Sequence, residues 1–384
     1  EIFTPKRNMY LYGIGYAAAS IDCTAAAVLP FVLYLSTLGG SATALGIGGL
    51  MMGLLVLMIA GLPIAFALMI APGISLFFDG QQSMFPMLLM RMYNGMDSFP
   101  LMAIPYFILA GEVMNRGGIT TRLVRLSQAL IGHLRGGLAH VNILSSILFA
   151  GLSGSAVADT SAIGSMLIPA MEKNGYTKRF SAAVTAASSV IGPIIPPSGI
   201  MIIYAFVMNV SVAGLFAAGL VPGLMVGFSL MGMTVYLSKK RNYPVASQRA
   251  SFNEVFISFK GAILPLLTPI IILGGILAGI FTPTEAAAIA AGYAILISVF
   301  VLRTLKFKDI PKVLFNAALS SGMILFLVGA STAFATLVSL TGTAPKAMEI
   351  MNSISQNPLV LLFLVNLLLF FVGMFLDAGP AILI

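Results

Sequence analysis

The octapeptide GPIIPPSG at positions 192–199 interrupts an apolar stretch that runs from 180 to 210. Its tandem prolines, Pro196 and Pro197, remove backbone hydrogen bonds and break a helix. Backbone freed in this way is tolerated at membrane depth only where it is buried in protein or lines a cavity. The stretch therefore predicts one broken helix that crosses a membrane.

The composition of the whole chain points to a membrane protein. Of its 384 residues, 59% are hydrophobic and 8% are charged, against about 25% charged residues in an ordinary soluble domain. A soluble fold cannot hide that much apolar surface, which excludes a soluble enzyme, a nucleic-acid-binding protein and a disordered protein. The lone cysteine, Cys23, excludes an intrachain disulfide and a cysteine-based metal site.

Several further stretches are long and apolar enough to span a bilayer as helices. These candidate spans are 10–38, 42–60, 63–80, 99–115, 212–237, 261–281, 284–302 and 322–341. Two other stretches are interrupted, 140–173 by GLSGS at 151–155 and 358–384 by GMFLDAGP at 373–380. A break at the middle of 140–173 predicts a re-entrant hairpin, which enters, turns near the midplane and leaves on the same side.

The basic residues support this topology. If residues 1–8 are cytoplasmic and 140–173 re-enters, 18 of the 20 Lys and Arg lie on the cytoplasmic side, and only Arg91 and Lys346 lie opposite. This is the distribution that the positive-inside rule expects. A fully crossing 140–173 would place the basic loop 238–260 outside. Two amphipathic segments, 117–135 and 343–356, are predicted to lie along the interface.

The breaks recur at a fixed offset, which indicates an internal repeat. Gly151 and Gly373 are 222 positions apart, and the breaks at Pro63 and Pro283 are 220 apart. The first unit makes an odd number of crossings, so the second has inverted topology, an architecture found in secondary transporters with midplane sites at helix breaks. On this offset the second unit is incomplete, lacking about one hairpin arm and two helices.

The repeat divides the chain into four parts. Residues 1–40 form a joining or anchor helix, and 41–237 form the first inverted repeat, with its hairpin at 140–173 and its broken helix at 180–210. Residues 238–260 form the cytoplasmic basic loop. Residues 261–384 form the incomplete second repeat, with a hairpin from 358.

Five motifs together resemble one family. They are DSFPL at 97–101, GLSGSA at 151–156, IGPIIPPS at 191–198, GIFTPTEAA at 279–287 and GMFLD at 373–377. The chain from about 42 onward resembles the large permease subunit of tripartite ATP-independent periplasmic (TRAP) transporters. The resemblance implies an all-α polytopic, inverted-repeat, elevator-type ion transporter fold with two re-entrant hairpins and broken helices.

The same resemblance implies a function and partners. Such a permease sits in the bacterial inner membrane and imports a small carboxylate, such as sialic acid or a C4-dicarboxylate, driven by sodium. It receives the substrate from a periplasmic binding protein and works with a small four-helix subunit. That subunit is fused upstream in some members, and residues 1–40 resemble the joining segment. It is no enzyme, and it needs no cofactor besides the coupling ion Na⁺.

Helix breaks suit sodium, because a hard cation prefers oxygen ligands and a break frees backbone carbonyls. The resemblance implies a first sodium site at Ser153, Ser155, Gly192, Ile195 and Pro197, and places Gly373 in a second one. Asp377 and Ser198 are assigned to the substrate cavity or its shaping. Asp377 is a functional candidate because a carboxylate inside an apolar run is costly. The alternative for Gly-x-Ser-Gly is close helix packing by small residues.

Acidic residues near other helix ends receive simpler interpretations. Asp159 is expected to be the N-cap of the returning hairpin arm, Thr282 or Thr284 to cap a helix with Glu285 in its first turn, and Glu112 to pair with a nearby arginine.

Three other functions remain open on the sequence. A sodium:carboxylate symporter of the same architecture would work without a binding protein. An intramembrane serine protease could use Gly-x-Ser-Gly at 151–154, but needs a histidine base at midplane depth, and neither His133 nor His140 is placed there. A channel would not need an inverted pair of hairpins.

Overall fold

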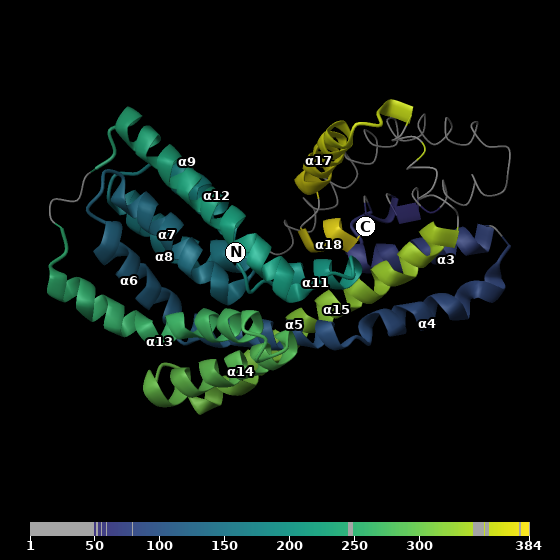
Figure 1. Cartoon of the computed structure of the whole chain (residues 1–384), viewed down its shortest axis with the longest axis horizontal. Coiled ribbons are helices and arrows are strands. Elements are labelled where there is room, and N and C mark those ends of the chain that lie inside the picture. Colours follow the sequence, from purple (N-terminus) through teal and green to yellow (C-terminus); the bar gives the residue numbers. More distant parts are fainter. Residues whose placement is uncertain are drawn as a thin grey trace, which may run out of the picture. The chain divides into compact units, whose positions relative to one another are not determined.

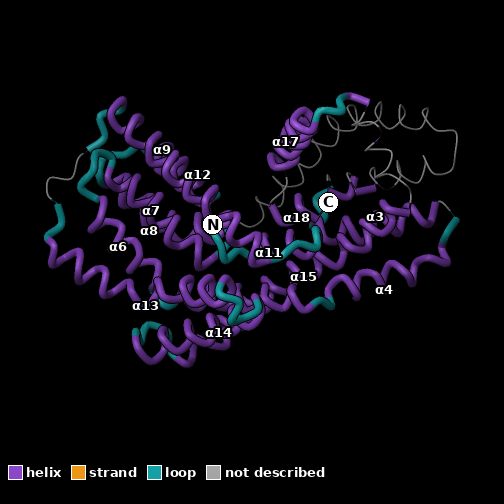
Figure 2. The backbone as a smooth tube through the Cα atoms, in the orientation of Figure 1, coloured by secondary structure: helices purple, strands orange, loops and turns teal. Residues whose placement is uncertain are grey.

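The computed structural model describes residues 50–340, except 51, 52, 55, 59, 79 and 245–248, together with 349, 353–375 and 378–383. Within these ranges every regular element is helical (Figure 2). This confirms the predicted all-α polytopic architecture. The expected joining helix at 1–40 lies outside the described residues, as does most of the amphipathic segment expected at 343–356.

The helices form two compact units, one made by residues 99–322 and the other by the described residues before and after that range. The flanking unit holds α3 (Ile64–Phe78), η1 (Gln82–Met84), α4 (Phe85–Met96), α17 (Pro358–Phe375), α18 (Ala378–Leu383) and the end of α15 (Ile310–Leu340). Its core packs α3, α4 and α15 through buried leucines and alanines. A Cβ on Gly329 of α15 would lie 2.9 Å from the Met92 carbonyl oxygen, so small residues set this close approach.

The 99–322 unit carries the first hairpin and the broken helix. In chain order it contains η2 (Phe99–Met102), α5 (Ala103–Arg116), α6 (Ile119–Ile131), α7 (Gly137–Ser153), α8 (Ala156–Lys173), α9 (Lys178–Ser189), α10 (Ile191–Ile194), α11 (Gly199–Val207), α12 (Val212–Lys240), α13 (Phe252–Leu277), α14 (Pro283–Leu296), η3 (Ile297–Val301), η4 (Phe307–Asp309) and the start of α15. Figure 1 shows α7, α8, α9 and α12 lying alongside one another.

Four described helices are long and apolar enough to cross a membrane: 212–240, 252–277, 283–301 and 307–340. They match four predicted spans, but the helices that start at 252 and 307 begin well before the predicted 261 and 322. Ser251 and Glu254 form a capping box, so α13 starts nine residues before the expected 261. Because α12 also continues to Lys240, the connection expected over 238–260 is much shorter.

Two local predictions are confirmed. Thr282 caps α14 in a capping box with Glu285, and Pro283 occupies the first turn. Glu112 pairs with Arg116 at 2.7 Å and also accepts a hydrogen bond from the Asn316 side-chain amide at 3.0 Å.

Candidate functional site

The first interruption is a helical hairpin with a two-residue tip. Helices α7 and α8 pack against each other and are joined by Gly154 and Ser155. Gly154 is left-handed, at φ 60°, a conformation that favours glycine. Ser155 is extended, and its hydroxyl accepts a hydrogen bond from the Ala158 amide at 3.4 Å. Ser155 is therefore the N-cap of α8, and the expectation that Asp159 fills this role is wrong.

The second interruption is the predicted broken helix. The segment 178–194 and helix α11 are bent by 47° at a break of four residues, 195–198. Ile195 and Ser198 are extended, with ψ of 124° and 128°, and the bond between Pro196 and Pro197 is cis. Prolines cannot donate the helical hydrogen bonds that continuation would need, so the helix stops and restarts.

The hairpin tip lies directly against this break. A Cβ on Gly154 would lie 3.0 Å from the Pro197 carbonyl oxygen and 3.3 Å from the Gly199 nitrogen. One on Gly151 would lie 3.5 Å from the Pro196 oxygen, and one on Gly192 would lie 3.4 Å from the carbonyl carbon of Ser155. Backbone therefore meets backbone at this junction, and the left-handed φ and close contacts of Gly154 favour glycine at the tip.

This junction is rich in oxygen atoms. The last carbonyls of α7 and α10 have no partner within their own helices and carry the negative end of each helix dipole. The Ser198 hydroxyl is fully buried and has no hydrogen-bond partner among the described residues. Backbone carbonyls and hydroxyls are the ligands that a hard monovalent or divalent cation prefers. The residues present therefore fit a cation.

The structure brings together most of the predicted first site. Ser155, Gly192 and Pro197 meet at the junction, and Ser198, which was expected in the substrate cavity, lies there as well. Ile195 lies in the break, but its side chain faces Gly223 of α12, so only its backbone could serve as a ligand. Ser153 ends α7. Gly373 lies in α17 of the other unit, and Asp377 lies outside the described residues.

Asp159 is the residue whose importance the sequence interpretation missed. It lies in the first turn of α8 and is fully buried. A Cβ on Gly192 would lie 3.2 Å from its carboxyl carbon, so the carboxylate borders the break. No local sequence pattern signals this position, because it depends on the packing of α8 against the break. An ionised carboxylate at this position would compensate the charge of a bound cation.

Helix α12 packs against the break through a glycine ridge, which consists of Gly219, Gly223 and Gly227. A Cβ on Gly219 would lie 2.7 Å from the Ile194 carbonyl oxygen, and one on Gly227 would lie 2.6 Å from the Ile147 side chain. All three glycines are buried. The spacing of four is the small-residue pattern by which membrane helices approach closely, so the sequence did contain this signal.

A chain of buried polar side chains joins the hairpin to the broken helix. The Asn142 amide donates to the Thr185 hydroxyl at 2.7 Å, and its oxygen accepts from Ser188 at 3.1 Å. Ser146 donates to Ser188 at 3.0 Å. Hydrogen bonds between helices fix the register of α7 against α9, and hence of the tip against the break.

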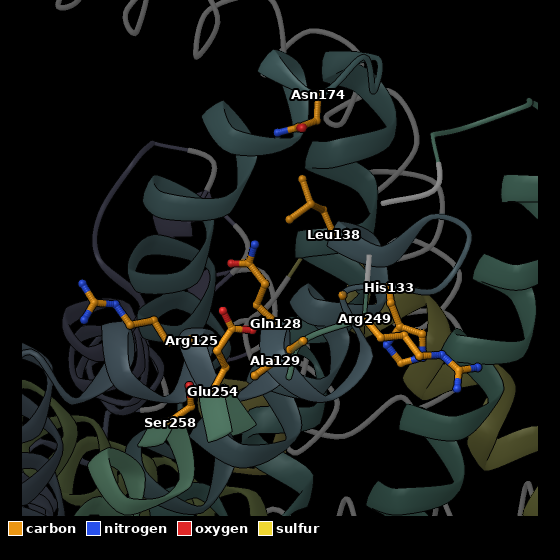
Figure 3. A pocket seen from close by; sticks show the side chains of 11 residues that line it. Arg125, Gln128, Ala129, His133, Leu138, Asn174, Arg249, Glu254 and Ser258 are labelled. Carbon is orange, nitrogen blue, oxygen red and sulfur yellow. The ribbon is translucent and has the colours of Figure 1, made fainter. Parts of the chain in front are cut away.

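A cavity of about 530 Å³ in the 99–322 unit is a different site. It lies between α6, the start of α7 and the start of α13, and Arg125, His133, Arg249 and Glu254 line it. Figure 3 shows Arg125 pointing away from Gln128 and Glu254. The charged side chains that line the cavity therefore do not converge on one ligand.

Neither histidine is placed to serve a protease. His133 lines this cavity. His140 lies in the first turn of α7, about 20 Å along the helix from the Gly-x-Ser-Gly tip. Since no histidine reaches the tip, the serine has no such base.

Comparison with known proteins shows the family of this chain. Residues 51–384 match the family described as "Tripartite ATP-independent periplasmic transporter, DctM component". A putative TRAP transporter large permease protein of Haemophilus influenzae is 40% identical over 331 residues, which cover 85% of this chain and 76% of the relative.

Two further relatives carry substrate names. The sialic acid TRAP transporter large permease protein SiaM of Vibrio cholerae is 39% identical, with 88% of this chain and 78% of the relative covered. The C4-dicarboxylate TRAP transporter large permease protein DctM of Rhodobacter capsulatus is 36% identical, with 86% and 78% covered. The chain therefore belongs to the DctM family of TRAP transporters, and it is a multi-pass inner-membrane permease rather than an enzyme.

Proposed function

We propose that this permease takes up a small carboxylate coupled to sodium, with one sodium ion bound between the first hairpin tip and the Pro-Pro break. The observation that carries the proposal is the contact of the two breaks, backbone to backbone, beside the buried Ser198 hydroxyl. The ligands are the Ser155 hydroxyl and carbonyls of Ser153, Gly192, Ile195 and Pro197.

Two features favour an ion over simple close packing of small residues. Close packing accounts for glycine at 154, but it does not require a fully buried carboxylate at Asp159. Burying a carboxylate costs free energy, and a cation bound at the junction would add a favourable Coulomb interaction with it. The two helix C-termini that end at the junction add partial negative charge on the same side.

The substrate class follows from relatives and from helix polarity. The two named relatives are a sialic acid and a C4-dicarboxylate permease, and both substrates carry carboxylates. Helices α8 and α11 begin at the junction, and their N-termini carry partial positive charge that attracts a carboxylate. Sodium at the C-termini and the anion at the N-termini would stabilise each other.

Sodium supplies adequate energy for accumulation. One positive charge that moves through 100 mV contributes ~2.3 kcal/mol. Two or more ions therefore support roughly tens- to thousands-fold accumulation. A second sodium site includes Gly373 in the second hairpin, and Asp377 fixes that hairpin or the cavity beside it.

The partners are those of a tripartite system, in line with the family description. A periplasmic binding protein delivers the carboxylate, and a small membrane subunit accompanies this permease. The alternative is a symporter of the same architecture that takes its substrate directly from solution.

Uptake into proteoliposomes that contain the intact permease tests the proposal. We expect radiolabelled carboxylate to accumulate only with an inward sodium gradient and the cognate binding protein. Equal uptake with potassium on both sides would rule out sodium coupling. Uptake without the binding protein would favour the direct symporter, and these two results are independent.

A further inference from the structure

A second cavity, of about 320 Å³, lies between α9 and α12 with Ile143 of α7 at its wall. Figure 1 shows these two helices side by side. Most of the lining is apolar, and the small side chains of Ala183 and Ala187 leave the space. The apolar residues that α12 contributes are Leu230, Met233 and Leu237.

The cavity is charged at one end only. Arg179 is the second residue of α9, and Arg241 directly follows the last residue of α12. Ala187 and Leu230 lie about 12–16 Å deeper along these helices. No acidic side chain is among the described residues that line the cavity. The result is a groove with two cations at its mouth and an apolar floor.

An aromatic cluster packs beside the charged end. The rings of Tyr176 and Phe180 each lie 4.7 Å from that of Tyr243, and the Arg241 guanidinium lies 5.6 Å from the Phe180 centroid. Burial raises the pKa of Tyr176 to about 12, so its hydroxyl is neutral at physiological pH. Basic residues gather at these two helix ends, with Lys178 beside Arg179 and Lys239 and Lys240 beside Arg241. The positive-inside rule therefore places the two arginines at the cytoplasmic face of the membrane.

We propose that this groove binds one anionic phospholipid, with its phosphate between Arg179 and Arg241 and an acyl chain along Ala187 and Leu230. Guanidinium groups match phosphate oxygens in geometry as well as charge. Basic pockets between membrane helices at the cytoplasmic side take anionic headgroups. An amphiphile fits both ends of the groove, whereas a free anion would leave the apolar length unfilled.

Native mass spectrometry of the intact permease in detergent tests this with phosphatidylglycerol as the probe. Replacing both arginines, Arg179→Ala with Arg241→Ala, should lower the affinity roughly fivefold per arginine. The matched control, Lys239→Ala with Lys240→Ala, removes two neighbouring exposed cations that do not line the groove and should stay within about twofold of wild type.

Ala187→Phe keeps both arginines and fills the groove, so it should also weaken binding if an acyl chain lies there. Size-exclusion profiles identify any variant that fails to fold, and Ala187→Phe provides an independent test in that case. Unchanged phosphatidylglycerol affinity in both the arginine and the Ala187→Phe variants would overturn the proposal.

Competition assays separate the other occupants. Phosphatidylcholine should bind more weakly than phosphatidylglycerol, and inorganic phosphate should not displace it. Displacement by millimolar phosphate would indicate a free-anion site. Crosslinking of a photoreactive residue at 187 to another protein, instead of to lipid, would assign the groove to a partner helix. Either result would replace the lipid proposal.

Discussion

The Asp159 carboxyl group packs against Gly192, where an added Cβ would lie 3.2 Å from the carboxyl carbon. This pair links the hairpin to the broken helix, because Asp159 follows the tip of α7 and α8 and Gly192 precedes the Pro-Pro break. Both residues are fully buried or nearly so. A carboxylate in that position can stabilise a cation that neither break would hold as strongly alone.

Asp159→Asn should raise the sodium concentration for half-maximal uptake by about tenfold or more, because a close charge pair at an intermediate dielectric is worth several kcal/mol. Asparagine has nearly the same shape, so protein yield should hold. Glu172→Gln is the matched control, since it removes an exposed acid near the other end of α8. An unchanged sodium dependence in Asp159→Asn would remove Asp159 from the site.

The glycine ridge of α12 should be intolerant of even one methyl group. Gly223→Ala places its Cβ against Ile195, with the Ile194 side chain at 3.3 Å, and we expect a loss of about 1–3 kcal/mol from overpacking. Gly232→Ala lies on the same helix with nothing within 4 Å, and it should be neutral or slightly stabilising. Thermal unfolding of the two purified variants compares them. Equal melting temperatures would contradict the close contact.

The polar chain between α7 and α9 should behave as a coupled unit. Asn142→Ala leaves the Thr185 and Ser188 side chains with fewer partners, at a cost of about 1–3 kcal/mol. A double-mutant cycle of Asn142→Ala with Thr185→Ala should give a coupling energy of about 0.6–1.7 kcal/mol, the range for hydrogen bonds between membrane helices. Additive effects in that cycle would show that the two residues act independently.

Topology can be tested at exposed positions in a Cys23→Ser background. Single cysteines at Lys178 and Arg249 should react only with reagents that reach the cytoplasm, and one at Gln82 should react from the periplasm, because the basic residues lie mainly on one side. All three positions are exposed. Labelling of residue 249 from the periplasm would show that 140–173 crosses the membrane and is not re-entrant.

How much the sequence predicts depends on the residue type. Tandem prolines and Gly-x-Ser-Gly act locally, so the breaks at 195–198 and 154–155 were both predictable. Capping also acts locally, which is why Thr282 was identified correctly, whereas Ser155 competed with Asp159 for one cap and the sequence alone favoured the wrong residue. The burial of Asp159 against Gly192 depends on tertiary packing between segments more than 30 positions apart, and no local pattern encodes it.

Asp377 remains the predicted counterpart of Ser155 in the second repeat, 222 positions later. It lies between α17, which ends at Phe375, and α18, which begins at Ala378, so the helices flank the predicted second break on both sides. The acid stands in an apolar run where a charge costs several kcal/mol. Asp377→Ala in the intact permease should therefore abolish or sharply reduce sodium-driven uptake, while the protein reaches the membrane in normal amount.

Asp377→Asn separates two roles, because it keeps hydrogen bonding and loses the charge. Uptake retained in Asn but lost in Ala would assign Asp377 to shaping the hairpin, and loss in both would assign it to charge. Wild-type uptake in Asp377→Ala would show that it has neither role.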